Sequence, residues 1–401
     1  MAALTEVFAE RLLAVAATDA SDADHAAILL TDFLACATAG SSRRSWYADL
    51  VAIDTSDPAA VADAAAAAHV HDRDDVHWAT LVHCGSIIWP VVLGTGAATR
   101  ASGPELLTAA RIGYEAMVRL ATFLGPDHRA RFHPTATTGT VGAAAAAAFL
   151  YGLDGQAFTA ALGHAVSVMG GSAQTVRERR GTRLFHRAHA ARSGLAAAEA
   201  AARGLVATVA GLEQLSDRPA DALIGGAESA LAQASVRLFP VSGWNQAVYD
   251  AAAGAGPFTG PIRQVCVDVA PAVAGVSTGP DAEAADRDWS VEWSVARALV
   301  GPEAAGELAG RVVVSRTRSS PLEAVVEVVT PGGRSVGQVH VPQGHPSRPA
   351  SRAQLHEKWR RQTVVPPEQL YSECRALLAA SRPDGARALA ELCTSKPPLE
   401  S

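Results

Sequence analysis

Four histidines and three aspartates lie within the nineteen residues from Ala68 to Ser86, AHVHDRDDVHWATLVHCGS. Imidazole and carboxylate groups at this density are costly to bury and contribute little to packing. A carboxylate next to an imidazole raises the pKa of the ring and so tunes it as an acid or a base. The segment therefore predicts acid–base chemistry around Asp72. A continuing helix would place Asp72, Asp75 and Val76 on one face with a histidine, but a loop is equally compatible with the pattern.

The segment RFHPTATTG places His133 directly before the start of a helix. Thr137 or Thr138 can cap that helix, and its free backbone N–H groups could bind a carboxylate. Taken alone, His133 is interpreted equally well as a histidine packed in a loop.

A basic stretch follows further along the chain. Within thirteen residues it carries Arg177, Arg179, Arg180, Arg183, His186, Arg187 and His189. Guanidinium groups pair bidentately with carboxylates, so the stretch predicts an anion clamp, although a solvated basic loop explains the same residues. His186 and His189 are three residues apart and can point inward together.

A metal site is the main alternative for the first segment. The HxH pattern followed by aspartate is similar to the HxHxDH pattern of metallo-β-lactamases, but Arg73 and Asp74 stand where that pattern needs Asp and His. The DRDD run has the wrong order for the DDxxD motif of terpene synthases, and no second metal motif follows it. We therefore expect no metal.

Composition excludes several other classes of function. The net charge of −6 gives no basic field for nucleic acid or an anionic membrane. Five cysteines without CxxC spacing, an amphipathic start rather than a signal peptide, and the lack of a long apolar run predict a reduced, cytoplasmic chain. The chain has two lysines, Lys358 and Lys396, so any general base is expected to be His, Asp, Glu or Tyr.

The elements that must position these residues change in character along the chain. Up to residue 235, apolar periodicity and Gly and Pro stops predict helices, including 22–39 and an alanine-rich helix capped by Asp57 and Pro58. A helix opened by Gly103 and Pro104 is expected to close at Gly125. After Val236, valine-rich alternation and a Pro-Gly-Gly turn predict strands and a hairpin, with a helix over 290–300 between strands. We predict a mainly α fold: a helical domain (1–235, completed by a C-terminal helix at 366–401) with an inserted, smaller α+β domain (236–365).

Taken in order, the segments resemble the MmgE/PrpD family, which includes 2-methylcitrate dehydratase, cis-aconitate decarboxylase and iminodisuccinate epimerase. The matches are His69 with Asp72–His77 to H-x-x-D-[FY]-D-D-T-H, His83–Ser86 to HPGS, Gly113–Glu115 to GYE, Phe132–Thr135 with Gly139 to FHPT…G, Thr182–Gly194 to T-K-x-L-H-x-G-x-A-A-x-S-G, Arg237–Pro240 to K-x-Y-P, and Trp289 onward to F-S-x-x-Y-x-V-A. The resemblance implies a helical domain with an α+β lid, a site between them, no cofactor, and a homodimer.

Four positions depart from the family pattern. Arg183 and Arg237 stand where lysines are expected, Val76 where threonine is expected, and Trp293 where tyrosine is expected. Arginine binds anions but is a poor proton donor near neutral pH. The losses of two hydroxyls predict a drier pocket, less suited to a small tricarboxylate.

We expect a cofactor-independent enzyme that abstracts a proton α to a carbonyl or carboxylate of a small-molecule substrate. His83 or His133 would be the base, Asp72 would orient or charge it, and His186 would be the acid. The substrate is expected to contact His69, Asp75, Val76, His77, Arg183, Arg237 and Trp293. Dehydration, decarboxylation, epimerisation and cyclisation remain open outcomes. The alternatives are a catalytically inactive paralogue that binds ligands, and a metal-dependent cyclase or hydrolase.

Overall fold

The computed structural model describes all residues except 1, 19–20, 42–56, 227, 259 and 382–401. The chain divides into two compact units: unit 1 is Met1–Ser235 with Trp359–Ser401, and unit 2 is Val236–Lys358. The predicted domains differ from these units at residues 359–365. Trp359 is fully buried and its indole N–H donates to Asp32 Oδ1 over 3.0 Å, which ties this part of the chain to unit 1.

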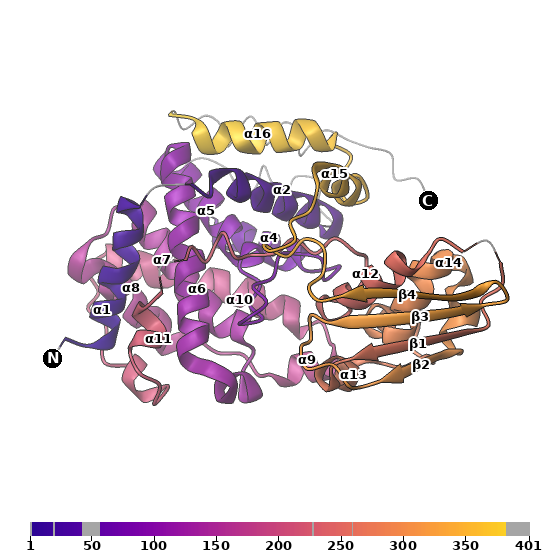
Figure 1. Ribbon diagram of the computed structural model, residues 1–401. Coiled ribbons are helices and arrows are strands. Elements are labelled where there is room, and N and C mark those ends of the chain that lie inside the picture. The colour runs from indigo at the N-terminus through magenta and orange to yellow at the C-terminus, as the bar shows by residue number, and fades with distance from the viewer. Residues whose placement is uncertain (1, 19–20, 42–56, 227, 259, 382–401) are drawn as a thin grey trace. The chain divides into compact units, whose positions relative to one another are not determined.

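Unit 1 is helical (Figure 1). Its helices are α1 (Leu4–Leu13), α2 (Ala23–Gly40), α4 (Pro58–Ala68), α5 (Gly85–Thr99), α6 (Gly103–Arg131), α7 (Pro134–Leu150), α8 (Gly155–Val168), α9 (Gln174–Glu178), α10 (Thr182–Ala202), α11 (Asp221–Ile224) and α16 (Pro367–Ala379). The predicted cap of α4 is confirmed, because the Asp57 carboxylate accepts a hydrogen bond of 2.9 Å from the Ala59 N–H and Pro58 is the first helical residue. Helix α16 matches part of the predicted C-terminal helix, and the predicted residues 382–401 lie outside the described ones.

Helix α7 forms the centre of unit 1, packed against both α6 and α10. Small residues make this close packing possible. A Cβ at Gly142 would clash with Met117 of α6, and one at Gly194 of α10 would clash with Ala143. The alanine-rich composition thus brings the beginnings of α7 and α10, which carry the predicted site residues, close together.

The predicted end of a helix at Gly125 is confirmed. Gly125 is non-helical, with φ +69°, and the helical segment that follows it, counted within α6, continues to Arg131. Helix α7 begins at Pro134, so Thr137 and Thr138 lie inside its first turns instead of capping it. Their hydroxyls donate to the Pro134 carbonyl over 3.2 and 2.8 Å.

Unit 2 contains a four-stranded sheet with the order β2-β1-β3-β4 (Figure 1). Strand β1 (Gln264–Val269) pairs in parallel with β2 (Val312–Ser315) and antiparallel with β3 (Ala324–Thr330), which forms the predicted hairpin with β4 (Gly333–Val339). The helices are α12 (Gln246–Ala255), α13 (Pro271–Val276), α14 (Val291–Ala309) and α15 (Arg352–Arg360), the last of which spans the boundary between the units. Valines of the sheet share one core with residues of α12 and α14. A mainly helical chain with one small sheet is therefore confirmed.

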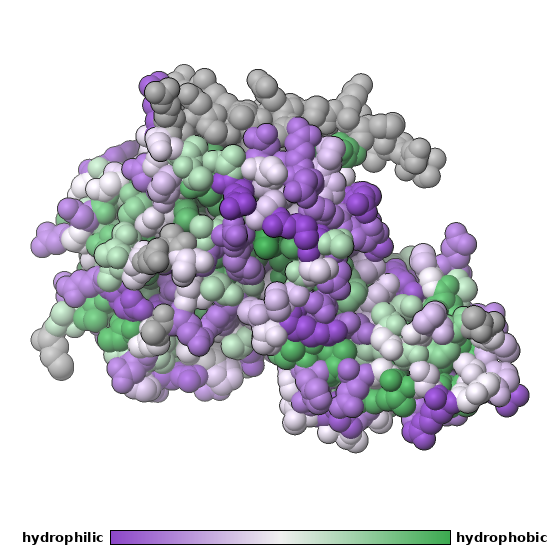
Figure 2. All heavy atoms as spheres, turned by 45° about the horizontal axis from the view of Figure 1, so that its top comes forward, coloured by the Kyte–Doolittle hydropathy of each residue, from purple (hydrophilic) through white to green (hydrophobic). Residues whose placement is uncertain are grey.

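The face of the molecule that Figure 2 draws mixes hydrophilic and apolar residues, with several apolar groups between polar ones. Scattered apolar side chains of this kind are ordinary for a protein surface. Within the described parts of the chain, we find no helix with the length and apolar character needed to cross a membrane.

Candidate active site

The loop after α4 folds the first histidines and aspartates back onto one another. Helix α4 ends at Ala68, and the Asp72 N–H donates to the His69 carbonyl over 2.9 Å. Asp72 adopts a left-handed conformation, with φ +51°, which aspartate tolerates better than most residues. Of the two conformations compatible with the sequence, the structure has the loop.

His69 is buried against two carboxylates. Its Nδ1–H donates to Asp74 Oδ1 over 2.6 Å, and its Nε2 lies 3.7 Å from Asp72 Oδ1. Burial, followed by the charge of Arg187, lowers the pKa of His69 to about 4, although both aspartates act in the opposite direction. At neutral pH the ring is therefore uncharged, with its Nδ1 proton held by Asp74.

A backbone carbonyl fixes the tautomer of His83. Its Nδ1 lies 2.7 Å from the backbone carbonyl of Asp75, and because a carbonyl only accepts, the ring must donate from Nδ1. In the neutral ring this leaves the lone pair on Nε2. The side chain is 16% exposed, compared with 4% for His69, so this ring is the more accessible of the two.

Asp75 holds His83 through its backbone carbonyl, while its carboxylate binds other groups. Its Oδ1 accepts from the Gly85 N–H and its Oδ2 from the Tyr114 hydroxyl, each over 2.8 Å. Burial, followed by the nearby Asp74, raises the pKa of Asp75 to about 7. A Cβ at Gly85 would lie 2.9 Å from the Tyr114 hydroxyl oxygen, so glycine is needed at this first residue of α5.

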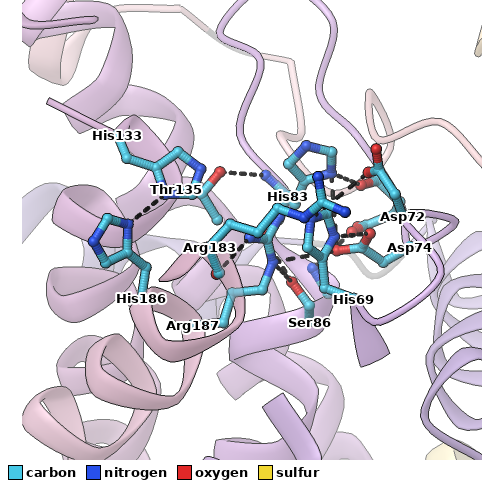
Figure 3. Close-up of polar contacts among 12 residues, drawn as sticks. His69, Asp72, Asp74, His83, Ser86, His133, Thr135, Arg183, His186 and Arg187 are labelled. Carbon is cyan, nitrogen blue, oxygen red and sulfur yellow. Dashed lines mark hydrogen bonds and ion pairs between the residues drawn. The ribbon is translucent and has the colours of Figure 1, made fainter. Parts of the chain in front are cut away.

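Arg187 of α10 brings a buried cation to the same place. Its Nε donates to Ser86 Oγ over 3.2 Å and lies 3.7 Å from Asp74 Oδ2, while its Nη1 donates to the Arg183 carbonyl over 3.1 Å. The side chain is 1% exposed. Arg187 thus balances the charge of Asp74, and Figure 3 shows the Arg183 side chain extending across it toward His83.

His133 and His186 form a second group at the beginnings of α7 and α10. Their Nδ1 atoms lie 3.1 Å apart and their ring centroids 5.3 Å apart. Burial, followed by the charge of Arg187, lowers the pKa of both rings, most strongly that of His133. The charges of His83 and His69 also act on His133, so the two histidine groups are neighbours in unit 1 (Figure 3).

The structure therefore brings most of the residues predicted for the site into one region of unit 1. These are His69, Asp72, His83, His133, Arg183 and His186. Asp72 was expected to orient the base, but the atom that fixes the orientation of His83 is the carbonyl oxygen of Asp75.

The sequence prediction gave no individual role to two members, Asp74 and Arg187, although Arg187 lies in the basic stretch predicted as an anion clamp. Asp74 contacts both His69 and Arg187. Arg187 is found one helical turn after Arg183 and next to His186, and that spacing was a usable signal, because residues three and four apart share a helix face.

Other predicted substrate contacts have structural partners. The His77 Nδ1 lies 2.8 Å from Thr80 Oγ1, and its Nε2 donates to Gln233 Oε1 over 3.0 Å, so both ring nitrogens are occupied. Val76 is buried and exchanges backbone hydrogen bonds with Ser235. For Val76, His77 and Asp75, contact with substrate stays a prediction.

Arg237 and Trp293 belong to unit 2. The Trp293 indole N–H donates to the Pro280 carbonyl over 2.8 Å, and the Arg287 guanidinium lies 3.9 Å from the centroid of its ring. Arg237 is buried. Their predicted contact with a substrate held by unit 1 also stays a prediction.

One group in the described parts of the chain has the geometry to hold a metal ion. Ligand atoms of His69, Asp74 and His83 all lie within 4.8 Å of one another. Binding there would have to break the short His69–Asp74 hydrogen bond and place a cation next to the Arg187 guanidinium. Because like charges repel strongly at a buried site, the donor set fits proton transfer better than metal ligation.

Part of the chain is similar to known proteins. Residues 52–228 match the MmgE/PrpD N-terminal domain. The human cis-aconitate decarboxylase is 35% identical over 145 residues, which cover 35% of this chain and 30% of the human protein. Over residues 52–228, the chain therefore belongs to the MmgE/PrpD family.

Proposed function

We propose that this chain is a lyase-type enzyme that needs no cofactor and abstracts a proton α to a carbonyl or carboxylate. The family match and the similarity to a decarboxylase support the lyase class. The similarity spans less than a third of the human protein, so its particular reaction is not transferred to this chain. The local geometry supports the mechanism.

The orientation of His83 is the observation that carries the proposal. A general base needs an unprotonated nitrogen directed at the substrate and a second nitrogen that holds the ring in place. The Nδ1–H donated to the Asp75 carbonyl meets the second requirement and, in the neutral ring, places the lone pair on Nε2. Asp74 lies 3.8 Å from the same Nδ1, where its negative charge would stabilise the ring once it has taken up a proton.

Two arginines from α10 are suited to the negative charge that proton removal creates. Arg187 is buried beside Asp74, and Arg183 is half-buried and reaches toward His83 (Figure 3). A guanidinium stabilises a carboxylate or an enolate but does not exchange protons near neutral pH. With arginine at position 183, proton transfer is left to the histidines, and His83 and His133 take the roles of base and acid.

The substrate we propose is an acid of specialised metabolism that is larger and more apolar than citrate-type acids. This rests on Val76 and Trp293, which stand where the family pattern has hydroxyl-bearing residues. Dehydration, decarboxylation, epimerisation and ring closure all begin from the same carbanion, so the reaction depends on what the substrate carries next to it.

The test is hydrogen exchange at the acidic carbon. The protein is incubated in deuterated water with cis-aconitate, 2-methylcitrate and a panel of larger 2-substituted acids, and deuterium uptake and products are followed by NMR and mass spectrometry. His83→Gln is expected to lower the rate for the best substrate by about 10²–10⁴-fold. His71→Gln changes an exposed histidine of the same loop and is the matched control.

A folded His83→Gln protein that keeps the wild-type rate would show that His83 is not the base. Efficient turnover of cis-aconitate or 2-methylcitrate would contradict the proposed change of substrate but not the lyase class.

A further inference from the structure

The contact between His133 and His186 joins two nitrogens of the same type, Nδ1 to Nδ1, over 3.1 Å. This is a hydrogen-bond distance, and a hydrogen bond needs one donor and one acceptor. A neutral imidazole carries a single N–H, so two neutral rings can form this hydrogen bond only if they are different tautomers. One ring must be protonated on Nδ1 and the other on Nε2.

The surroundings of the pair lower the pKa of both rings and so oppose a charge on either. The titratable and charged groups that act on His133 are Arg187, His186, His83 and His69, and those that act on His186 are Arg187 and His189. These neighbours are cations or histidines, and the two rings are 7% and 8% exposed. Burial and a nearby guanidinium both oppose a second proton, so the pair shares one Nδ1 proton.

The two rings face in different directions. Figure 3 shows His133 between His186 and the region of Arg183 and His83, with His186 on the far side of His133. His186 is followed one turn later by His189, which is exposed, and is preceded by Phe185, which is 65% exposed. The pair therefore extends from the candidate active site toward the outside of α10.

We propose that His133 and His186 form a proton relay, in which His186 acts on the active site only through His133. In one state His133 carries Nε2–H and an Nδ1 lone pair, and His186 carries Nδ1–H. His133 gives its Nε2 proton to the site, the Nδ1 proton of His186 passes to His133 Nδ1, and His186 takes up a proton from water on Nε2. One proton enters and one leaves, and the pair ends in the opposite tautomeric state.

Gly171 positions this relay. Its carbonyl accepts a hydrogen bond of 2.9 Å from the backbone N–H of His133. Its φ of +129° is accessible to glycine and strained for other residues. A Cβ there would lie 2.8 Å from Ala136 Cβ and 3.3 Å from both Nδ1 and Cε1 of His186. Glycine thus fixes His133 through its backbone and lets the His186 ring approach.

The relay is tested by NMR on the whole protein with ¹⁵N-labelled histidine rings, without any substrate. We expect a scalar coupling between the two Nδ1 nitrogens across the hydrogen bond, and shifts for both that lie between those of protonated and unprotonated nitrogen. Both rings should also respond together at each step of a pH titration, because the macroscopic pKa values of a coupled pair belong to both rings.

Each other outcome overturns part or all of the inference. Two rings that are both protonated on Nε2, with no coupling, would remove the hydrogen bond. A coupling with one ring fixed as Nδ1–H would leave a static pair and overturn the relay. The use of the relay in catalysis rests on the proposed function, but these readouts do not, so they can succeed where the His83 experiment fails.

Variants add a matched comparison. Gly171→Ala is expected to abolish or strongly reduce the coupling, whereas Gly170→Ala, where a Cβ meets no atom within 4 Å, should keep it. His186→Phe keeps an aromatic ring but removes the acceptor, so His133 should change to a single Nε2–H tautomer. If His133 keeps its wild-type shifts in folded His186→Phe, the relay is wrong.

Discussion

The two histidine groups of unit 1 are both buried, yet they hold their protons in different ways. In the carboxylate-flanked group, His69, Asp74 and His83, an acceptor fixes the tautomer of each ring: Asp74 for His69 and the Asp75 carbonyl for His83. In the histidine pair, His133 and His186, each ring is the partner of the other. Burial and the charge of Arg187 lower the pKa of His69, His133 and His186, but the hydrogen-bond partner of each ring decides whether its proton is fixed or can move.

Arg187 connects the two groups. Its charge acts on His69, His133 and His186, and it lies 3.7 Å from Asp74. Replacing Arg187 should therefore affect both histidine groups at once, and we expect it to have the largest effect.

Arg187→Met is expected to destabilise the protein by about 3–5 kcal/mol, because it leaves the Asp74 carboxylate buried without its cation. The free energy of unfolding is measured by urea denaturation. The pKa values of His69, His133 and His186 should rise together, which histidine NMR would detect.

The matched control is Arg192→Met, since Arg192 is an exposed arginine of the same helix, and its change should stay within about 0.5 kcal/mol. Equal stability of the two variants would mean that Arg187 does not balance a buried charge.

His69 and Asp75 make opposite contributions to the pH dependence of the free energy of unfolding. The folded pKa of His69 is about 4, below its ordinary 6.5, so between these values the unfolded chain binds the extra proton and stability falls as pH falls. The folded pKa of Asp75 is about 7, above its ordinary 3.8, so its contribution has the opposite sign and falls as pH rises. The two contributions oppose each other between pH 4 and 6.5.

Asp75→Asn removes one of these opposing contributions. On acidification from pH 6.5 to 4, the variant is expected to lose stability more steeply than the wild type, by up to about 1.4 kcal/mol for each pH unit. Urea denaturation at several pH values measures the difference, and Asp217→Asn, at an exposed position, is the control. Parallel curves for Asp75→Asn and wild type would contradict the assignment.

Tyr114→Phe weakens the support of His83 without changing a charge. It removes the hydroxyl that donates to Asp75 Oδ2 over 2.8 Å and leaves a buried acceptor with one partner fewer. We expect a loss of about 1–3 kcal/mol in the free energy of unfolding. Tyr249→Phe, at a half-buried ring of unit 2, should cost less. If the two substitutions cost the same, the Tyr114 hydroxyl does not support the site.

The fold was largely predictable where local chemistry decides it. Asp57 and Pro58 begin α4 as predicted, and the Pro-Gly-Gly turn lies between β3 and β4. The start of α7 directly after His133 was predicted as well, but the capping role expected for Thr137 or Thr138 was not found. Both lie inside the first turns of α7, where their hydroxyls donate to the Pro134 carbonyl.

The site was predictable in its members but not in their roles. Residue types pointed to His69, His83, His133 and His186, and all four lie in one region (Figure 3). His77 has the same residue type, yet Thr80 and Gln233 occupy both of its nitrogens. The role of a histidine depends on which groups face its nitrogens, and Gln233 is distant in sequence. Asp75 shows the same limit, because its backbone carbonyl rather than its carboxylate orients the base.

Metal removal is expected to have the smallest effect on the stability of the protein. It tests directly whether the carboxylate-flanked group is an acid–base group or a metal site. If His69, Asp74 and His83 bound a metal, the two histidine groups would differ in chemistry and not only in proton partners. A metal at one hundred times its dissociation constant would stabilise the protein by about 2.7 kcal/mol. We expect no change in the unfolding midpoint after treatment with a chelator or after addition of Zn²⁺, because Arg187 already supplies a positive charge 3.7 Å from Asp74. A stabilisation by Zn²⁺ that disappears in His69→Gln would place a metal at this group and contradict the acid–base assignment.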